Sequence, residues 1–441
     1  MVRGSLSADN APLVPRHLAP PWWALLTLPF GLAVGFASVA VPFILRLRGV
    51  DMMLIATVSQ VAQLPHIIKI FWAPVLDSGP RRRSWFFGSI AVTAIALAAT
   101  ALIPPSPTER FGPVPLLWIF TGALFVAQAA VATSSSAVLA LMALTVPAAR
   151  RGAASGWQTA GNLAGSATGG ALIAWMLRHL PPATTAMVLV AVCAACTVPA
   201  AFVHEAPLPR RSALRLVVAL LGELWQTLRS REGWTGLLIC LSPVGAGALT
   251  NLFSALATDY APDEASAERL VVVVTGVFGG IVNAVGALLG GYLADRMNRR
   301  LAYVLCSAIT ALCAVGMMLG PATPAAFTIG CLAYLLANGL CYAAYYAFVL
   351  DLVGKREGVT TQLALFAGAG NLATSYVTGL DGWSYDHAKA WFPGHEGGGR
   401  GAMLGMDALS TFAGIAALAA MVAFARRAGA RAPASTPVPL G

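Results

Sequence analysis

The chain has 441 residues, of which 58% are hydrophobic and only 10% are charged. Soluble domains carry about 25% charged residues because their surface faces water, so this composition excludes an ordinary soluble protein and favours one surrounded by lipid. The net charge of +10 comes from 28 Lys+Arg against 18 Asp+Glu. The basic residues lie in short loops between apolar segments, which indicates membrane topology rather than nucleic-acid binding.

Apolar segments long enough to cross a bilayer recur along the whole chain. One span of the ~30 Å hydrocarbon core takes ~20 residues, and lipid requires each span to be helical. The first six predicted spans cover residues 23–44, 53–75, 84–103, 115–145, 153–177 and 183–203. The second six cover residues 234–258, 268–293, 301–320, 325–350, 360–380 and 402–425. The sequence therefore predicts an all-α, polytopic membrane protein of about twelve transmembrane helices.

The longest polar connection, residues 204–233, divides the chain near its middle. Its apolar residues from Leu214 to Leu228 recur at helical spacing, which predicts an amphipathic helix on the membrane surface. An aspartate before an arginine cluster and the tetrapeptide GNLA each occur once on either side of this linker, so we expect two related halves. The predicted organisation is a tail over 1–22, a six-helix half over 23–203, the linker over 204–233, a second six-helix half over 234–425, and a tail over 426–441.

Lys and Arg are distributed unevenly between the two sides of the predicted membrane. The side that holds both tails and the linker carries 20 of them, and the other side carries 7. Positively charged loops favour the cytoplasm. We therefore expect both termini to be cytoplasmic, in the inner (cytoplasmic) membrane of a bacterium, and we expect a monomer.

Each half carries a charged motif where a helix ends on the cytoplasmic side. A carboxylate there that faces arginines forms a charge-assisted contact, which joins two helices on one side of the membrane. We expect this contact to act as a gate, and a static topology anchor is the alternative. The gating candidates are Asp77, Arg81, Arg82, Arg83, Asp295, Arg296, Arg299 and Arg300.

The stretch GGYLADRMNRR at residues 290–300 resembles the loop signature of the major facilitator superfamily, and the resemblance extends over essentially the whole chain. The variant in the first half resembles the branch that contains the AmpG-type muropeptide permeases and the acetyl-coenzyme A transporters. The residues that carry this second resemblance are Lys69, Trp72, Ala73, Pro74 and Asp77. The resemblance implies secondary transport by alternating access between two six-helix halves.

Polar residues inside the predicted spans are candidates for function, because lipid makes them costly. Hydrogen bonds between helices are the alternative role for any one of them. Together they predict an aromatic-lined, uncharged polar cavity suited to sugar hydroxyls, amides or a flat heterocycle. The predicted substrate-binding residues are Gln63, His66, Gln128, Gln158, Asn162, Asn251, Asn338, Tyr342, Tyr345 and Asn371.

Proton coupling would need at least one group that changes its charge during transport. Histidine titrates near neutral pH, so His66 is a candidate, and a packed, hydrogen-bonded histidine is the alternative. The full set of candidates is His66, Lys69, Asp259 and Asp351.

Several kinds of chemistry lack a sequence signal. The chain has no GxxxxGK[ST] motif, no typical metal-ligand cluster and no nucleophile–base pattern, so we expect no enzyme activity, catalytic residue, metal, cofactor or direct drive by ATP. The leading hypothesis is secondary transport of an organic solute, with proton-coupled import of a muropeptide-like or other large polar substrate. The alternatives are transport of an acyl-coenzyme A or siderophore-type solute, and a non-transporting membrane scaffold of the same fold.

Overall fold

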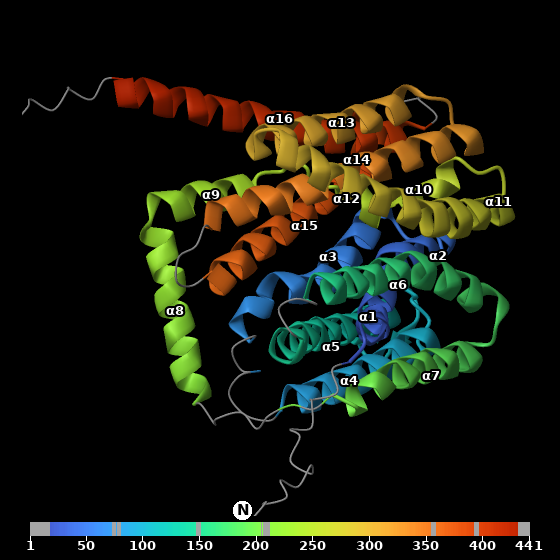
Figure 1. Cartoon of the computed structure of the whole chain (residues 1–441). Coiled ribbons are helices and arrows are strands. Elements are labelled where there is room, and N and C mark those ends of the chain that lie inside the picture. The colour runs from blue at the N-terminus through green and yellow to red at the C-terminus, as the bar shows by residue number, and fades with distance from the viewer. Residues whose placement is uncertain are drawn as a thin grey trace, which may run out of the picture.

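The computed structural model describes residues 18–430, apart from 73–75, 77–80, 147–150, 204, 206–211, 354–358 and 392–396. Nearly all of the described residues lie in helices, and β1 (Arg110–Phe111) pairs with β2 (Val114–Pro115) in a short hairpin. The helices form two layers, one above the other in Figure 1. The predicted all-α class is therefore confirmed.

The first layer, which we call the N half, is built from the chain up to residue 203. Its helices cross the layer in alternating directions, so that each loop lies at one of two ends. They are α1 (Pro20–Gly35), η1 (Phe36–Ala40), α2 (Val41–Leu47), α3 (Met52–Ile68), η2 (Lys69–Phe71), α4 (Arg82–Leu102), α5 (Leu116–Thr145), α6 (Arg151–His179) and α7 (Pro182–Ala201).

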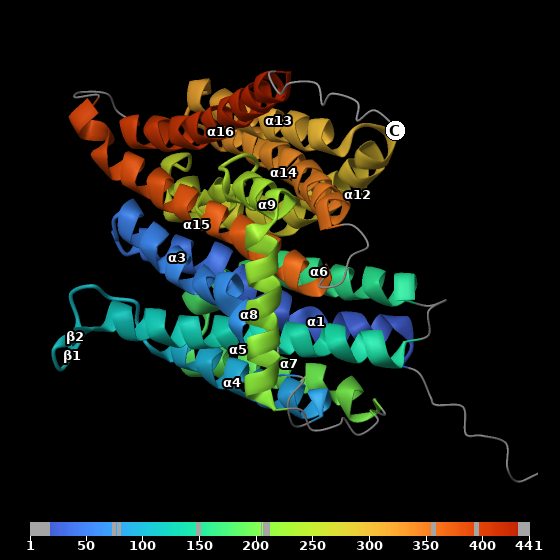
Figure 2. The same ribbon diagram turned by 90° about the vertical axis from the view of Figure 1, so that its left-hand side faces the viewer.

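The second layer, the C half, contains more interruptions. Its elements are α9 (Arg231–Leu241), η5 (Ala248–Asn251), α10 (Phe253–Leu256), η6 (Ala257–Asp259), α11 (Glu264–Arg269), η7 (Leu270–Phe278), α12 (Gly279–Arg296), α13 (Arg299–Leu319), α14 (Pro324–Val353), α15 (Val359–Trp391) and α16 (Gly398–Ala430). In the sequence, α8 (Ala213–Arg229) connects the two halves, and in Figure 2 it crosses in front of both layers. We call the end of the molecule where α8 lies the linker end.

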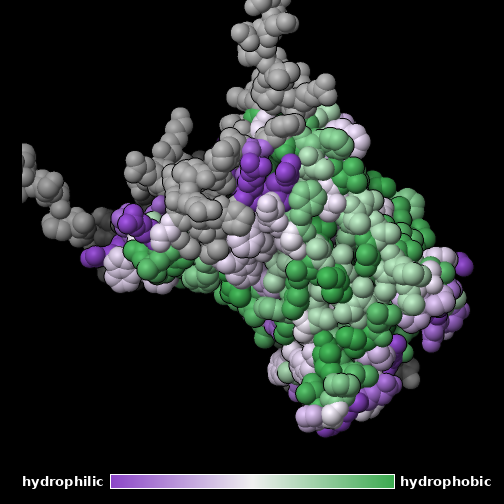
Figure 3. All heavy atoms as spheres, turned by 90° about the horizontal axis from the view of Figure 1, so that it is seen from below, coloured by the Kyte–Doolittle hydropathy of each residue, from purple (hydrophilic) through white to green (hydrophobic). Residues whose placement is uncertain are grey.

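The chain is a multi-pass membrane protein. Among the described residues, nine helical stretches are long and apolar enough to cross a membrane. Hydrophobic residues cover most of the face shown in Figure 3, and hydrophilic residues gather at its margins. The other predicted spans correspond to α6, α15 and the segment from α9 to η6. These are richer in glycine and polar residues, and α6 and α15 lie along the boundary between the two layers in Figure 1.

The predicted span 234–258 is interrupted, which corrects the expectation of one continuous helix. Helix α9 ends at Leu241, and helical structure resumes at Ala248. Within the gap, Gly245 and Gly247 have φ angles of 64° and 62°, a backbone conformation that glycine adopts without the penalty of a Cβ atom. Residues 242–247 therefore leave the helical path inside the membrane, and we call residues 242–251, from the end of α9 to the end of η5, the broken segment.

Side chains of neighbouring helices bind the carbonyl groups that this break releases. The Tyr303 hydroxyl on α13 donates to Val244 O, and Thr374 Oγ1 on α15 donates to Ala246 O at 2.9 Å. Irregular backbone is tolerated at membrane depth only where protein or a cavity surrounds it. The break is thus held in place by the C half itself.

A second correction concerns the length of α15. The predicted span ended at residue 380, whereas the helix continues to Trp391. The segment from Asp381 to His387 is too polar to count as a membrane span, but α15 packs along α3 and α16 here. This extension brings Asp381 into the interior, where it is fully buried.

Glycines allow α1 and α6 to approach backbone to backbone. A Cβ atom added to Gly31 would lie 2.1 Å from Asn162 O, and one added to Gly161 would lie 2.2 Å from Ala24 O. Real Cβ atoms do not make such contacts, so these two helices would have to separate.

We expect Gly31→Ala to destabilise the protein by about 1–3 kcal/mol, because the added methyl group overpacks the α1–α6 contact. The measurement is the thermal unfolding midpoint in detergent. The matched control is Gly88→Ala on α4, where an added Cβ meets nothing within 4 Å and alanine favours the helix. Equal midpoints for the two variants would contradict the close approach.

Candidate functional site

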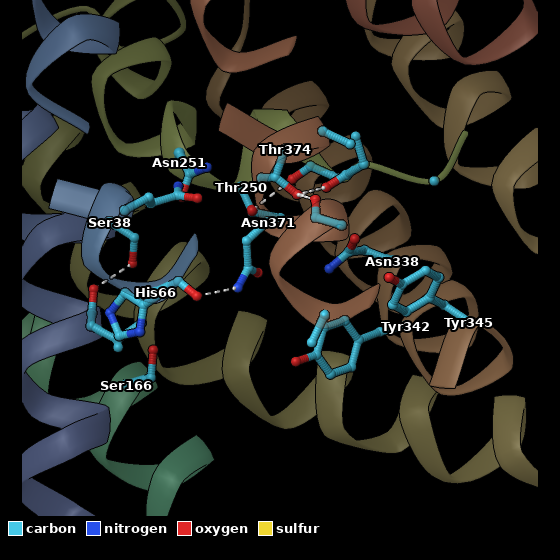
Figure 4. Close-up of a pocket in the computed structure, with 18 of the residues that line it drawn as sticks. Ser38, His66, Ser166, Thr250, Asn251, Asn338, Tyr342, Tyr345, Asn371 and Thr374 are labelled. Atoms are coloured by element: carbon cyan, nitrogen blue, oxygen red, sulfur yellow. Dashed lines mark hydrogen bonds between the residues drawn. The ribbon is translucent and has the colours of Figure 1, made fainter. Parts of the chain in front are cut away.

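A cavity of about 450 Å³ lies between the N half and the C half. Helices α1, α3, α5 and α6 line it from one side, and the broken segment, α14 and α15 line it from the other. Figure 4 shows side chains from both halves directed toward this space. Its volume is in the range of small-molecule binding sites.

All ten residues predicted to bind substrate line this cavity. They come from six different predicted spans, and their role in binding stays a prediction. The lining includes Gln63, His66, Gln128, Gln158, Asn162, Asn251, Asn338, Tyr342, Tyr345 and Asn371.

On the N-half wall, His66 and Gln128 form a fixed pair. Gln128 Nε2 donates to Ala33 O at 2.7 Å, which directs Gln128 Oε1 toward His66 Nε2 at 2.9 Å. With this amide orientation the imidazole donates through Nε2. The ring also lies edge-on to Phe30, with centroids 5.7 Å apart. His66 is therefore held by Gln128 and Phe30 while it lines the cavity.

On the C-half wall, three tyrosines of α14 line the cavity in a cluster, namely Tyr342, Tyr345 and Tyr346. The Tyr345 hydroxyl donates to Phe366 O at 2.7 Å, and the hydroxyls of Tyr342 and Tyr346 lie 3.2 Å apart. Tyr342 directs its hydroxyl toward the open space in Figure 4. This wall can hydrogen-bond a solute and stack against its flat parts.

The broken segment supplies cavity residues that the sequence interpretation missed. Ser242, Thr250 and backbone from Val244 to Gly247 line the cavity, as do Thr374 on α15 and Ser38 in η1. The stretch SPVGAG holds a proline and two glycines within six residues, a signal that predicts a helix break.

Helices α3 and α15 join the halves alongside the cavity. Gln60 Nε2 on α3 donates to Ser375 O at 2.8 Å, and Asn371 Nδ2 on α15 donates to His66 O at 3.4 Å. At the start of α3, the Asp386 carboxylate accepts from the backbone N–H groups of Met52 and Met53, at 3.1 and 2.6 Å. The positive helix N-terminus stabilises this carboxylate.

A charged cluster connects the halves at the end opposite the linker. Arg46 on α2 donates to Asp259 Oδ1 at 3.2 Å, and the Tyr385 hydroxyl on α15 donates to Asp259 Oδ2 at 2.6 Å. Arg46 also contacts the Tyr385 hydroxyl directly and lies over its ring, 4.9 Å from the centroid. We call Arg46, Asp259 and Tyr385 the lock cluster. Asp259, a proton-coupling candidate, is thus engaged in a contact between the halves.

A second group of ion pairs lies at the same end. Arg178, at the end of α6, lies 3.1 Å from Glu264 and 3.3 Å from Glu268 on α11. His179 Nε2 lies 2.9 Å from the other oxygen of Glu268. These contacts also join the N half to the C half, so this end is closed by charged groups from four elements.

The carboxylates of the predicted gates cannot be placed. Asp77 lies outside the described residues, and the side chains of Asp295 and Asp351 do as well, although their backbones belong to α12 and α14. Their roles in gating and proton coupling stay predictions.

Three arginines of those motifs, Arg82, Arg83 and Arg296, have local contacts. Glu205 accepts from the backbone N–H groups of Arg82 and Arg83, at 2.9 and 3.1 Å, and so caps α4. Arg296 lies over the ring of Tyr292 on its own helix, 4.1 Å from the centroid. Arg81 and Arg300 are exposed, and Arg299 is half-buried.

Metal chemistry has no visible site. Within the part of the chain that the structure describes, no group of three or more His, Cys, Asp or Glu side chains could hold a metal ion.

Comparison with known proteins identifies this architecture. The model of the Major Facilitator Superfamily matches residues 23–378, and a search of curated protein sequences returns no relative. The crystal structure of a D-xylose–proton symporter superposes with a TM-score of 0.66 at 13% identity, covering 90% of this chain and 95% of that one. The nucleoside transporter NupG gives 0.68 at 11% identity, covering 91% and 98%.

A third similar structure is a bacterial homologue of the human lysosomal transporter Spinster, in an inward-facing and unoccupied conformation. Its TM-score is 0.62 at 15% identity, covering 95% of this chain and 98% of that one. At these identities the three likenesses establish the fold.

The lock cluster should hold the halves together at its end of the molecule. We expect Asp259→Asn to weaken this contact by about 1 kcal/mol, the upper range for a partly exposed ion pair, and to raise the population open at this end about fivefold. The measurement is the distance between spin labels at Phe111 and Leu319, which are exposed on the N half and C half near this end.

The matched control is Arg110→Gln. Its guanidinium contacts only Pro113 O within its own hairpin, at 3.4 Å, so removing this charge should leave the label distance unchanged. A distance distribution in Asp259→Asn that equals the wild type would contradict the lock.

Proposed function

Because the chain belongs to the Major Facilitator Superfamily, we propose that it is a secondary transporter that moves a polar organic solute by alternating access. The observation that carries this proposal is the cavity between the halves, lined from both sides by amides, hydroxyls and tyrosines. Rocking of one half against the other would expose such a site to each side of the membrane in turn.

The lining favours a solute with hydroxyl or amide groups and a ring. Asn162, Asn338 and Asn371 offer both donors and acceptors, and Tyr342 and Tyr345 offer ring faces. A muropeptide combines sugar rings with peptide amides, which fits the resemblance of the first-half motif to the AmpG-type permeases. A sugar or nucleoside, the solutes named for two of the similar structures, shares this chemistry.

Coenzyme A esters suit the cavity less well. Their phosphate groups need several cationic partners, whereas Lys69 is the one lysine or arginine of the described residues that lines the cavity. A siderophore-type solute with several amides remains the second candidate, since the asparagines and tyrosines could bind it in the same manner.

We place the linker end in the cytoplasm, since most arginines of the loops lie there. The ion pairs then close the outer side, and the conformation is one that would exchange solute with the cytoplasm. A non-transporting scaffold of the same fold would not need a polar cavity of this size, and buried amides without a ligand would weaken it.

Solute binding should depend on the cavity side chains. We expect one of the tested muropeptides, neutral sugars, nucleosides or siderophores to raise the unfolding midpoint of the purified protein, while coenzyme A esters leave it unchanged.

Asn338→Ala should weaken binding of that solute about fivefold, which corresponds to the loss of about 1 kcal/mol for one hydrogen bond. The control Thr57→Ala removes a hydroxyl that bonds only Met53 O, away from the cavity. Failure of every solute class to shift the midpoint, together with absent uptake in proteoliposomes, would contradict transport.

We further propose that transport is coupled to protons, with His66 as the titrating group inside the cavity. Gln128 occupies Nε2 of the imidazole, so Nδ1 could gain a proton without breaking that hydrogen bond. The same ring lines the solute site. Solute and proton would then influence each other's binding there.

We expect a pH gradient across proteoliposomes to drive accumulation of the solute by wild-type protein. His66→Gln keeps a hydrogen-bonding group toward Gln128 but cannot change charge near neutral pH, so it should lower gradient-driven accumulation at least tenfold while exchange at equal pH persists. The control His387→Gln alters an exposed histidine bonded to Trp383 O on its own helix. Accumulation by wild type that ignores the gradient would identify a facilitator.

A further inference from the structure

Two aspartates of the C half are buried but belong neither to the cavity lining nor to the lock cluster. Asp381 on α15 is 0% exposed and Asp407 on α16 is 2% exposed. Neither oxygen of Asp381 accepts a hydrogen bond from a described residue. Native proteins pair or neutralise buried carboxylates because an isolated charge there is strongly destabilising. Asp381 therefore requires a partner that the described residues do not supply.

Asp407 is the better-supported member of the pair. The Tyr334 hydroxyl on α14 donates to its Oδ2 at 3.1 Å, and the backbone N–H of Leu249 donates to the same carboxylate. Both donors stabilise a negative charge on Asp407. Asp381 lies close enough for the two carboxylates to repel each other if both are ionised.

The pair adjoins the cavity wall through the broken segment. Leu249 lies in η5, and the next two residues, Thr250 and Asn251, line the cavity. Asn251 Nδ2 donates at 3.2 Å to Thr378 Oγ1, one helical turn before Asp381 on α15. A change of charge at the pair would therefore act on the same short segment that contacts the solute.

A second orphaned group lies on the facing segment. Ser254 is 0% exposed and its hydroxyl has no partner among the described residues. The contacts Asn251–Thr378 and Asp259–Tyr385 hold the segment 251–259 against α15. In the sequence, Ser254 lies between Asn251 and Asp259, and Asp381 lies between their partners Thr378 and Tyr385.

We propose that Asp381 and Asp407 form a proton-binding site, buried behind the solute cavity, in which the two carboxylates share one proton. Binding adds H⁺ from water to one carboxylate oxygen, and release returns it, with no other bond changed. Like charges this close and this buried do not both ionise. The role in coupling rests on the proposed proton-driven transport, whereas the existence of the site does not.

Other ligands fit this pair less well than a proton does. Divalent ions prefer several oxygen ligands, and the described residues hold no group of three His, Cys, Asp or Glu for a metal. Tyr334 and Leu249 direct hydrogen atoms, not oxygen lone pairs, at Asp407. The observed salt bridges include neither carboxylate.

The pair has few titratable neighbours. Tyr334 on α14 contacts the pair, and Cys341 lies further along the same helix. Other charged or titratable groups lie further along α15, α16 and the elements packed against them. They are Arg46, Asp259, Tyr260, Tyr385 and Arg400 toward the lock cluster, Tyr303 on α13, His66 on α3 and Lys69 in η2.

Infrared difference spectroscopy of the purified protein during titration from about pH 5 to about pH 9 tests the site without any solute. We expect a carbonyl band of a protonated carboxylic acid that disappears as the pH rises. The band should be lost in Asp381→Asn, which leaves Asp407 with its two donors. It should shift in frequency in Asp407→Asn, because Asp381 then stays a neutral acid without a partner among the described residues. It should persist in Asp386→Asn, which removes a carboxylate of the same helix that already has two backbone donors.

Two outcomes would overturn the proposal. One is a band that is absent from wild type or unchanged in both Asp→Asn variants. The other is a rise in the unfolding midpoint with sodium chloride but not choline chloride that Asp381→Asn abolishes, because this would assign the pair to sodium. If either variant does not fold, Asp381→Glu, which keeps the carboxyl group, should retain a shifted band.

The transport readout is separate. With a solute identified by the binding screen, Asp381→Asn should retain exchange at equal pH and lose accumulation driven by a pH gradient. If no solute is transported but the band behaves as expected, the proposed function fails and the proton site stands. If gradient-driven accumulation survives in Asp381→Asn, its role in coupling fails.

Discussion

The structure depends on one constraint, that every backbone polar group at membrane depth must find a partner inside the protein. Continuous helices meet it over most of the chain. The exception is the gap between α9 and η5, whose carbonyl groups bind the hydroxyls of Tyr303 and Thr374. The break is thereby possible only where α13 and α15 bring hydroxyl groups to it. The same break exposes backbone and the side chains of Thr250 and Asn251 to the cavity, so the constraint that forms the fold also shapes the site.

Close helix packing and the polar interior depend on each other. Glycines at the α1–α6 contact let these helices approach through their backbones, and α6 then presents Gln158 and Asn162 to the cavity. A polar helix such as α6 is costly against lipid but stable where a second half covers it. The association of the halves therefore permits polar side chains inside the membrane, and those side chains form the lining of the proposed solute site.

Ion pairs, uncharged polar groups and buried acids occupy different parts of the molecule. Ion pairs hold the halves together at the end opposite the linker, where exposure to water lowers the cost of charge. The cavity itself is lined mainly by uncharged amides and hydroxyls. Deeper still, the carboxylates of Asp381 and Asp407 lie behind the broken segment, where an unneutralised charge is least favourable. This arrangement of ion pairs, neutral donors and buried acids supports the proposed coupling of solute and proton movement.

The sequence by itself determined the fold class, the superfamily and most of the spans, because hydropathy is a local property that lipid selects segment by segment. It also singled out polar residues such as Gln128 and Asn338, since any amide within an apolar span is conspicuous. Only the tertiary structure decided which of them meet, because helix rotation is set by packing between distant segments. Hydropathy ended one span at residue 380, whereas α15 continues to Trp391 under cover of its neighbours. Asp381 thus fell just outside the predicted span. Only the folded chain buries it near Asp407, since burial is a property of the assembled helices and not of any one segment.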